Sequence, residues 1–136
     1  MTPFDIQKMT KYWLTTSEKD LEVARFLFKQ KYYPQSLFFC HLCLEKMLKY
    51  GFQKRKNKTA PFTHDLKRLA GLSGLALGKI QAEILDNISA FNISGRYVED
   101  KFEFYKKYNR QDFAQKYLRT TESLIIWLKQ EFQKKN

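Results

Sequence analysis

Apolar and polar residues alternate along most of this chain with the three- and four-residue spacing of amphipathic helices. The first such stretch runs from about Phe4 or Lys11 to Gln30. Its apolar stripe consists of Trp13, Leu14, Leu21, Ala24, Leu27 and Phe28. Asp20 falls inside this stripe by angle, so we expect its carboxylate to lie near the core or a cleft. Pro34 then interrupts the pattern and fits the first turn of a second helix, expected from Gln35 to about Gln53.

The segment from Ser36 to Lys49 within this second helix has two different faces. At about 100° per residue, its apolar arc contains Leu37, Phe39, Cys40, Cys43, Leu44, Met47 and Leu48. The other arc mixes the apolar residues Phe38 and Leu42 with Glu45, Lys46 and Lys49, and His41 lies on the border. We therefore predict that this helix contacts its own core on one side and a partner or ligand on the other.

The second half of the chain predicts three further elements. Thr63 is a candidate N-cap for a short helix from about His64 to Ala70. The apolar spacing then predicts a helix from about Leu77 to Phe91, and residues 96–109 are charged and aromatic without a clean period. A last helix starts near Arg110, with an apolar face made by Phe113, Tyr117, Leu124, Trp127 and Leu128.

The elements together predict an all-α protein. Long amphipathic helices joined mostly by short loops are typical of an antiparallel up-and-down four-helix bundle, here with an extra short helix between helices two and three. Residues 1–136 contain no repeat and no linker-like segment, so we expect a single domain.

Charge and cysteine content narrow the possible partners. The formal net charge of +11 favours encounter with polyanions, although a basic cytoplasmic protein without a specific polyanion partner would show the same excess. No segment resembles a signal peptide or a membrane span, so we expect a cytoplasmic protein without membrane contact. Cys40 and Cys43 leave only His41 and His64 as further zinc ligands, so we predict two buried reduced thiols and no metal site.

Few residues indicate catalysis, and no cofactor motif is present. The chain lacks a glycine-rich phosphate loop, a nucleophile elbow and a paired-histidine zinc helix. Glu45 and Lys49 suit either a surface ion pair or a place on the second helix face. Arg96 and Tyr97 can bind phosphate and stack on a base, or equally bind carbonyls at a helix end and fill a gap in the bundle.

Aromatic and basic residues also interleave between Lys101 and Arg110, as in proteins that bind single-stranded nucleic acids. Aromatic side chains that fold back onto the end of a bundle would give the same pattern. The segment therefore leaves both interpretations open.

Several short motifs, in their order and spacing, resemble the HEPN family, the higher-eukaryote and prokaryote nucleotide-binding domain, in its compact prokaryotic form. They are Trp13 with Asp20-Leu21 and Ala24, Tyr33 with Ser36 and Phe38-Phe39, Leu44-Glu45-Lys46 with Leu48-Lys49, Thr63-His64-Asp65-Leu66, and Arg96-Tyr97. The resemblance implies a helical bundle that forms a homodimer. It also implies pairing with a minimal nucleotidyltransferase in a toxin–antitoxin-like module.

Catalytic members of the family are ribonucleases that use an Arg followed, after about four to six residues, by a His. Here Lys101, Phe102 and Glu103 occupy those positions, and no histidine follows Arg96. The general acid or base of metal-independent RNA cleavage is therefore missing where the family places it.

Three hypotheses follow from the sequence. The first is a non-catalytic binding module for a nucleotide, RNA or a nucleotidyltransferase. Its ligand site comprises Arg96, Tyr97 and Lys49, oriented by Glu45 and Asp20, together with His64; Phe38 and Leu42 contact a partner. The second is a ribonuclease toxin with a rearranged site, in which His64 or His41 acts with Arg96. The third is a structural interaction protein whose basic surface has no specific ligand.

Overall fold

The structure, a computed structural model, describes residues 2–93 and 98–134, and its regular elements there are helices joined by loops. The helices are α1 (Pro3–Lys29), α2 (Tyr33–Lys56), α3 (Leu66–Leu72), α4 (Lys79–Ser89), α5 (Val98–Tyr108) and α6 (Gln111–Gln133). The prediction of an all-α bundle is confirmed.

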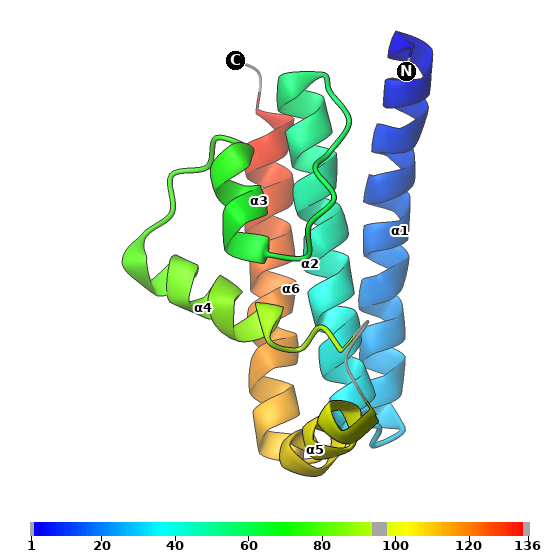
Figure 1. The fold of residues 1–136 in the computed structure, drawn as a ribbon, viewed down its shortest axis with the longest axis vertical. Coiled ribbons are helices and arrows are strands. Elements are labelled where there is room, and N and C mark those ends of the chain that lie inside the picture. Colours follow the sequence, from blue (N-terminus) through cyan, green and yellow to red (C-terminus); the bar gives the residue numbers. More distant parts are fainter. Residues whose placement is uncertain (1, 94–97, 135–136) are drawn as a thin grey trace.

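The three long helices α1, α2 and α6 lie side by side along the long axis of the molecule, with α2 in the centre (Figure 1). The α2 and α6 helices run in the same direction, and α1 runs opposite to both. The shorter α3 and α4 flank one side, and α5 crosses the end of the bundle opposite to the two termini. Because α2 packs against all five other helices, it has almost no free side.

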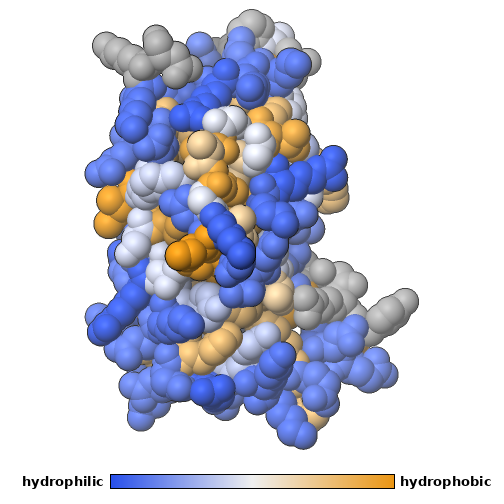
Figure 2. Space-filling view, turned by 90° about the vertical axis from the view of Figure 1, so that its left-hand side faces the viewer, coloured by the Kyte–Doolittle hydropathy of each residue, from blue (hydrophilic) through white to orange (hydrophobic). Residues whose placement is uncertain are grey.

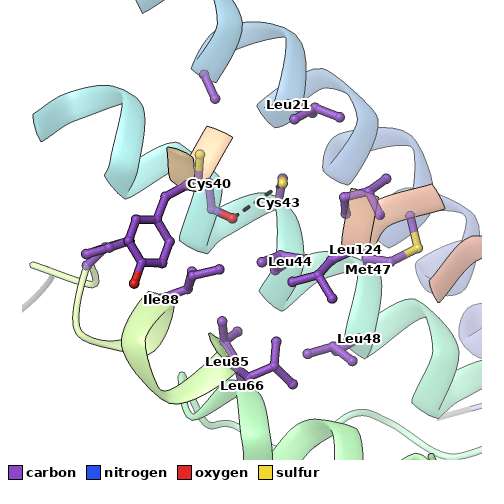
Figure 3. Close-up of a cluster of buried hydrophobic side chains, with 14 of the residues drawn as sticks. Leu21, Cys40, Cys43, Leu44, Met47, Leu48, Leu66, Leu85, Ile88 and Leu124 are labelled. Atoms are coloured by element: carbon purple, nitrogen blue, oxygen red, sulfur yellow. Dashed lines mark hydrogen bonds between the residues drawn. The ribbon is translucent and has the colours of Figure 1, made fainter. Parts of the chain in front are cut away.

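The core forms where the apolar arc of α2 meets the other helices. Figure 3 shows Leu21 of α1, Leu66 of α3, and Leu85 and Ile88 of α4 around the central residues of α2. The predicted buried thiols are confirmed, since Cys40 and Cys43 are free and fully buried. Burial raises the pKa of the Cys40 thiol to about 12 and that of Cys43 well above its usual value, so both thiols stay protonated.

The helix α5 was not predicted from the sequence. Its inner face carries Phe104, Tyr105 and Tyr108. The exposed Phe102 and the charged residues between these rings hide their helical spacing in the sequence. The Phe104 and Tyr108 rings contact Phe91, which follows α4, and Tyr108 also stacks on Phe113 of α6. Tyr117 of α6 contacts Phe91 and Phe113, and all these ring centroids are 4.9–6.5 Å apart. The aromatic residues of this segment thus mainly fold back onto the end of the bundle, as in the second of the two interpretations.

The short helix begins two residues later than predicted. Asp65, and not Thr63, is the N-cap of α3, because the Asp65 carboxylate accepts a hydrogen bond from the Arg68 backbone amide at 3.1 Å. The Thr63 hydroxyl instead accepts from the amide of Asp65 at 3.2 Å. Thr63 and Asp65 both precede the helix, and Asp65, which directly adjoins the first helical residue Leu66, is the N-cap.

The side of the molecule formed by α3 and α4 shows hydrophobic atoms among hydrophilic ones (Figure 2). Leu72 at the end of α3 and Ile80 at the start of α4 are among its exposed large apolar side chains. No helix in the described ranges is long and apolar enough to span a membrane.

Candidate functional site

Four polar side chains follow one another at four-residue steps along α2: His41, Glu45, Lys49 and Gln53, which we call the α2 polar row. All four are buried. They lie on the mixed side of α2, where the sequence predicted a second contact. For these residues the contact is made within the chain, because α1 and the loop of residues 57–65 supply their partners.

Glu45 is at the centre of this row. Its Oε1 atom lies 2.7 Å from Nδ1 of His64, and its Oε2 accepts a hydrogen bond from the Lys49 ammonium at 3.1 Å. The surface ion pair that the sequence allowed is therefore a buried one. A buried carboxylate is tolerated where a cation and further donors compensate its lost hydration. Lys49 provides the charge, and His64 provides the second donor.

His41 is completely buried beside this pair. Its Nε2 atom lies 3.1 Å from the backbone oxygen of His64, and since a carbonyl only accepts, Nε2 carries the proton. The Glu45 carboxylate, 3.7 Å away, is too distant for this hydrogen bond. Nδ1 of His41 has no hydrogen-bond partner among the described residues. Burial lowers the pKa of His41, which favours the neutral ring in the folded protein.

The other end of the row is fixed by α1. The Lys49 ammonium lies 5.0 Å from the centroid of the Trp13 ring, and the Trp13 indole donates to Gln53 Oε1 at 3.2 Å. The amide nitrogen of Gln53 donates to the hydroxyl of Thr10 at 2.9 Å. The oxygen and the nitrogen of the Gln53 side-chain amide therefore both have hydrogen-bond partners, as buried polar groups usually do.

The loop of residues 57–65 is fastened along the row at two places. The Ala60 amide donates to Gln53 Oε1 at 3.0 Å, and His64 makes the contacts with Glu45 and His41. Between these places Phe62 is 93% exposed, with its ring edge-to-face to that of His64 at 5.7 Å. The loop therefore places the solvent-exposed ring of Phe62 next to the imidazole of His64.

Comparisons with known proteins agree with this arrangement of helices. The model of the HEPN domain family matches residues 10–131. The chain belongs to the HEPN family. The crystal structure of an archaeal HEPN homologue superimposes with a TM-score of 0.64 at 21% identity, covering 91% of this chain and 98% of that one. At this identity the likeness concerns the fold. A search of curated proteins found no match.

The structure brings together some of the HEPN site residues expected from the sequence. Glu45, Lys49 and His64 form one hydrogen-bonded group. Asp20 makes a separate ion pair, with Lys46 at 2.7 Å, and its side chain is largely buried as its helical position predicted. Arg96 and Tyr97 lie outside the described residues.

The two HEPN residues predicted to contact a partner, Phe38 and Leu42, are only half-buried. Phe38 packs against the core and against Phe39, with ring centroids 5.9 Å apart. A partner could therefore cover the remaining part of both side chains, and their role stays a prediction.

The group around His64 suits ligand binding chemically. With Glu45 accepting from Nδ1 of His64, the Nε2 atom has no partner among the described residues and is an acceptor when the ring is neutral. The His64 side chain is 44% exposed. Within the described ranges, no three His, Cys, Asp or Glu side chains are placed to hold a metal ion.

Sequence reasoning missed Phe62 in this HEPN chain. In the sequence it is a lone aromatic after a proline, Pro61, and apolar loop residues usually fold inward. Its exposure is set by the hydrogen bonds of Ala60 and His64 on either side. The only local signal was the run of loop-forming residues around it.

Proposed function

We propose that this HEPN protein is a non-catalytic, homodimeric binding module for a nucleotide or RNA, working with a partner minimal nucleotidyltransferase in a toxin–antitoxin-like system. The ligand surface would centre on Phe62 and His64. Arg96, Tyr97, Lys49, Glu45 and Asp20 complete the set of residues assigned to this role by the sequence.

The observation that carries the proposal is the exposed ring of Phe62 beside the oriented imidazole of His64. Exposed aromatic rings bind nucleic acid bases by stacking, and each stacked base contributes about 1–3 kcal/mol. Lys49 cannot reach a phosphate without leaving Glu45, because its ammonium is buried between Glu45 and Trp13. It therefore supports the site indirectly, by balancing the charge of the carboxylate that orients His64.

The net charge of +11 supports the same ligand class, because it raises the local concentration of polyanions. A labelled 12-nucleotide RNA tests the proposal by fluorescence anisotropy at low salt. We expect binding that weakens steeply with salt. Phe62→Ala should weaken it about tenfold or more, from the loss of one stacked base. Phe26→Ala is the matched control, since Phe26 on α1 is also exposed, at 60%. Equal effects of both variants, or no RNA binding, would refute the role of Phe62.

The homodimer and the nucleotidyltransferase partner need a protein-binding surface. The exposed Leu72 and Ile80 on the α3–α4 side, and the half-buried Phe38 and Leu42, are the apolar residues that support it. Sedimentation of the whole protein should give a dimer. If this side forms the interface, Ile80→Glu dissociates the dimer, whereas Ile126→Glu, at an exposed position on α6, does not. A nucleotidyltransferase encoded next to this protein should co-purify with it, and its failure to do so would remove that part of the proposal.

One observation favours the second candidate, a ribonuclease with a rearranged site. His64 has its Nδ1 atom on a buried carboxylate and its Nε2 atom free of protein partners in the described structure, which is the arrangement of an oriented general base. This candidate predicts RNA degradation by the pure protein, lost in His64→Gln. An intact panel of RNAs after prolonged incubation would exclude it and leave the binding module.

A further inference from the structure

A cleft lies between the α1–α2 turn and α5. Both of these segments lie at the end of the bundle opposite to the termini (Figure 1). We call this cleft the α5 cleft. It measures about 340 Å³, within the usual size range of small-ligand pockets. It is separate from the site around His64 and is lined by Lys31, Tyr32, Pro34, Gln35, Tyr105 and Asn109.

The lining of the α5 cleft is polar and rich in hydrogen-bond donors. Apart from Pro34, every lining side chain carries an N–H or O–H group, and no carboxylate contributes to the lining. Two of the lining residues, Tyr105 and Asn109, come from the aromatic and basic segment 101–110. A cleft with donors, one ammonium and no acid is complementary to an anion.

Lys31 enters this lining from an unusual backbone conformation. Its φ of 66° is left-handed, a conformation that follows many helix ends but is normally taken by Gly or Asn. Lys31 therefore combines a strained backbone conformation with a charged side chain. Strain of this kind is often kept where the side chain has a function.

We propose that the α5 cleft binds one unpaired nucleotide. The Lys31 ammonium binds the phosphate, and the base stacks on the ring of Tyr32, which is 54% exposed. The amides of Gln35 and Asn109 provide a donor and an acceptor each for the edge of the base. The inference rests on the proposed nucleotide or RNA ligand and adds a subsite apart from Phe62 and His64.

Titration of the whole protein with AMP, followed by amide and side-chain NMR shifts, tests this subsite. We expect shifts at Gln35, Tyr105 and Asn109, and weaker binding of both adenosine and ribose 5-phosphate, because each lacks half of the contacts. Lys31→Asn should weaken AMP binding roughly tenfold, the effect of one charge-assisted hydrogen bond. Asn tolerates the left-handed conformation, so this variant should melt no lower than the wild type.

Lys19→Asn is the matched control, because it removes the same charge from an exposed position on α1. It should leave AMP affinity within about twofold, as expected for a distant, screened charge. Equal losses in both variants, AMP shifts confined to other surfaces, or no AMP binding would overturn the inference. If RNA binds through Phe62 while AMP ignores the α5 cleft, the proposed function stands without this subsite. If AMP binds in the cleft and RNA does not bind, the subsite stands alone.

Discussion

Gly51, in the middle of α2, is where a single methyl group should disturb the core most. Its Cα faces the ring of Phe132 on α6, and a Cβ added there would overlap three atoms of that ring. Phe132 is buried and packs edge-to-face on Tyr50, with ring centroids 6.3 Å apart. The Arg55 guanidinium lies over the Phe132 ring, 5.1 Å from its centroid. The ring therefore has little room to move, and α2 and α6 would have to separate.

Two effects of Gly51→Ala oppose each other. Alanine stabilises a helix interior by about 1 kcal/mol relative to glycine. Overpacking a core costs about 1–3 kcal/mol, and overlap with three ring atoms points to the upper end. We expect a net loss of about 2 kcal/mol, which in a domain of this size lowers Tm by roughly 6–10 °C.

Urea denaturation and calorimetry measure this change, with Gly71→Ala as the control. Gly71 lies in α3 with nothing within 4 Å of the added Cβ, so its replacement should gain up to about 1 kcal/mol. Phe132→Leu makes room for the methyl group, so Gly51→Ala should cost at least about 1 kcal/mol less in that background. A Tm that rises in Gly51→Ala as in Gly71→Ala would refute the close packing of α2 on α6.

Three further predictions concern polar groups. Lys49→Met leaves the Glu45 carboxylate buried without its cation and should cost about 3 kcal/mol, whereas Lys49→Met with Glu45→Gln should cost less than half of that in urea unfolding. Because the pKa of His41 is lowered on folding, the unfolded state binds more protons below pH 6.5, so stability is lost as the pH falls below this value. His41→Gln should show a shallower loss between pH 7 and 5, and equal slopes would contradict a buried neutral ring. Arg55→Lys should cost about 1–2 kcal/mol, because the guanidinium donates to the carbonyls of both Ser73 and Glu131 near the ends of α3 and α6, at 3.2 and 3.1 Å; an unchanged Tm would show that one ammonium replaces it.

The long helices could be predicted from the sequence and α5 could not, because they differ in how many turns repeat the apolar spacing. The α1, α2 and α6 stretches repeat their apolar spacing over many turns, so the pattern identifies each of them. The α5 helix has a short inner face, made by Phe104, Tyr105 and Tyr108. Phe91 and Phe113 supply the rings that Phe104 and Tyr108 contact. A short sequence pattern does not show which distant rings such a segment will contact.

The candidate site, too, could be predicted from the sequence only in part. The residue types of Glu45, Lys49 and His64 could be selected from the sequence, and their spacing placed Glu45 and Lys49 on one face of one helix. Their burial could not be predicted, because four-residue spacing of opposite charges is also the pattern of an exposed ion pair. The α1 helix and the returning loop decide it, because Trp13 lies over the Lys49 ammonium and the loop places His64 against Glu45.

By itself, the sequence determined that this protein is an all-α bundle and carries the motifs of its family, because periodicity and motif order are local properties of the chain. Tertiary structure alone decided that the mixed face of α2 is mostly covered from within the chain and that Phe62 stays exposed. It also decided that position 51 has no room for a Cβ atom, because the ring of Phe132 packs there. Each of these depends on which distant segment arrives at a given surface, and contacts of that kind leave no period in the sequence.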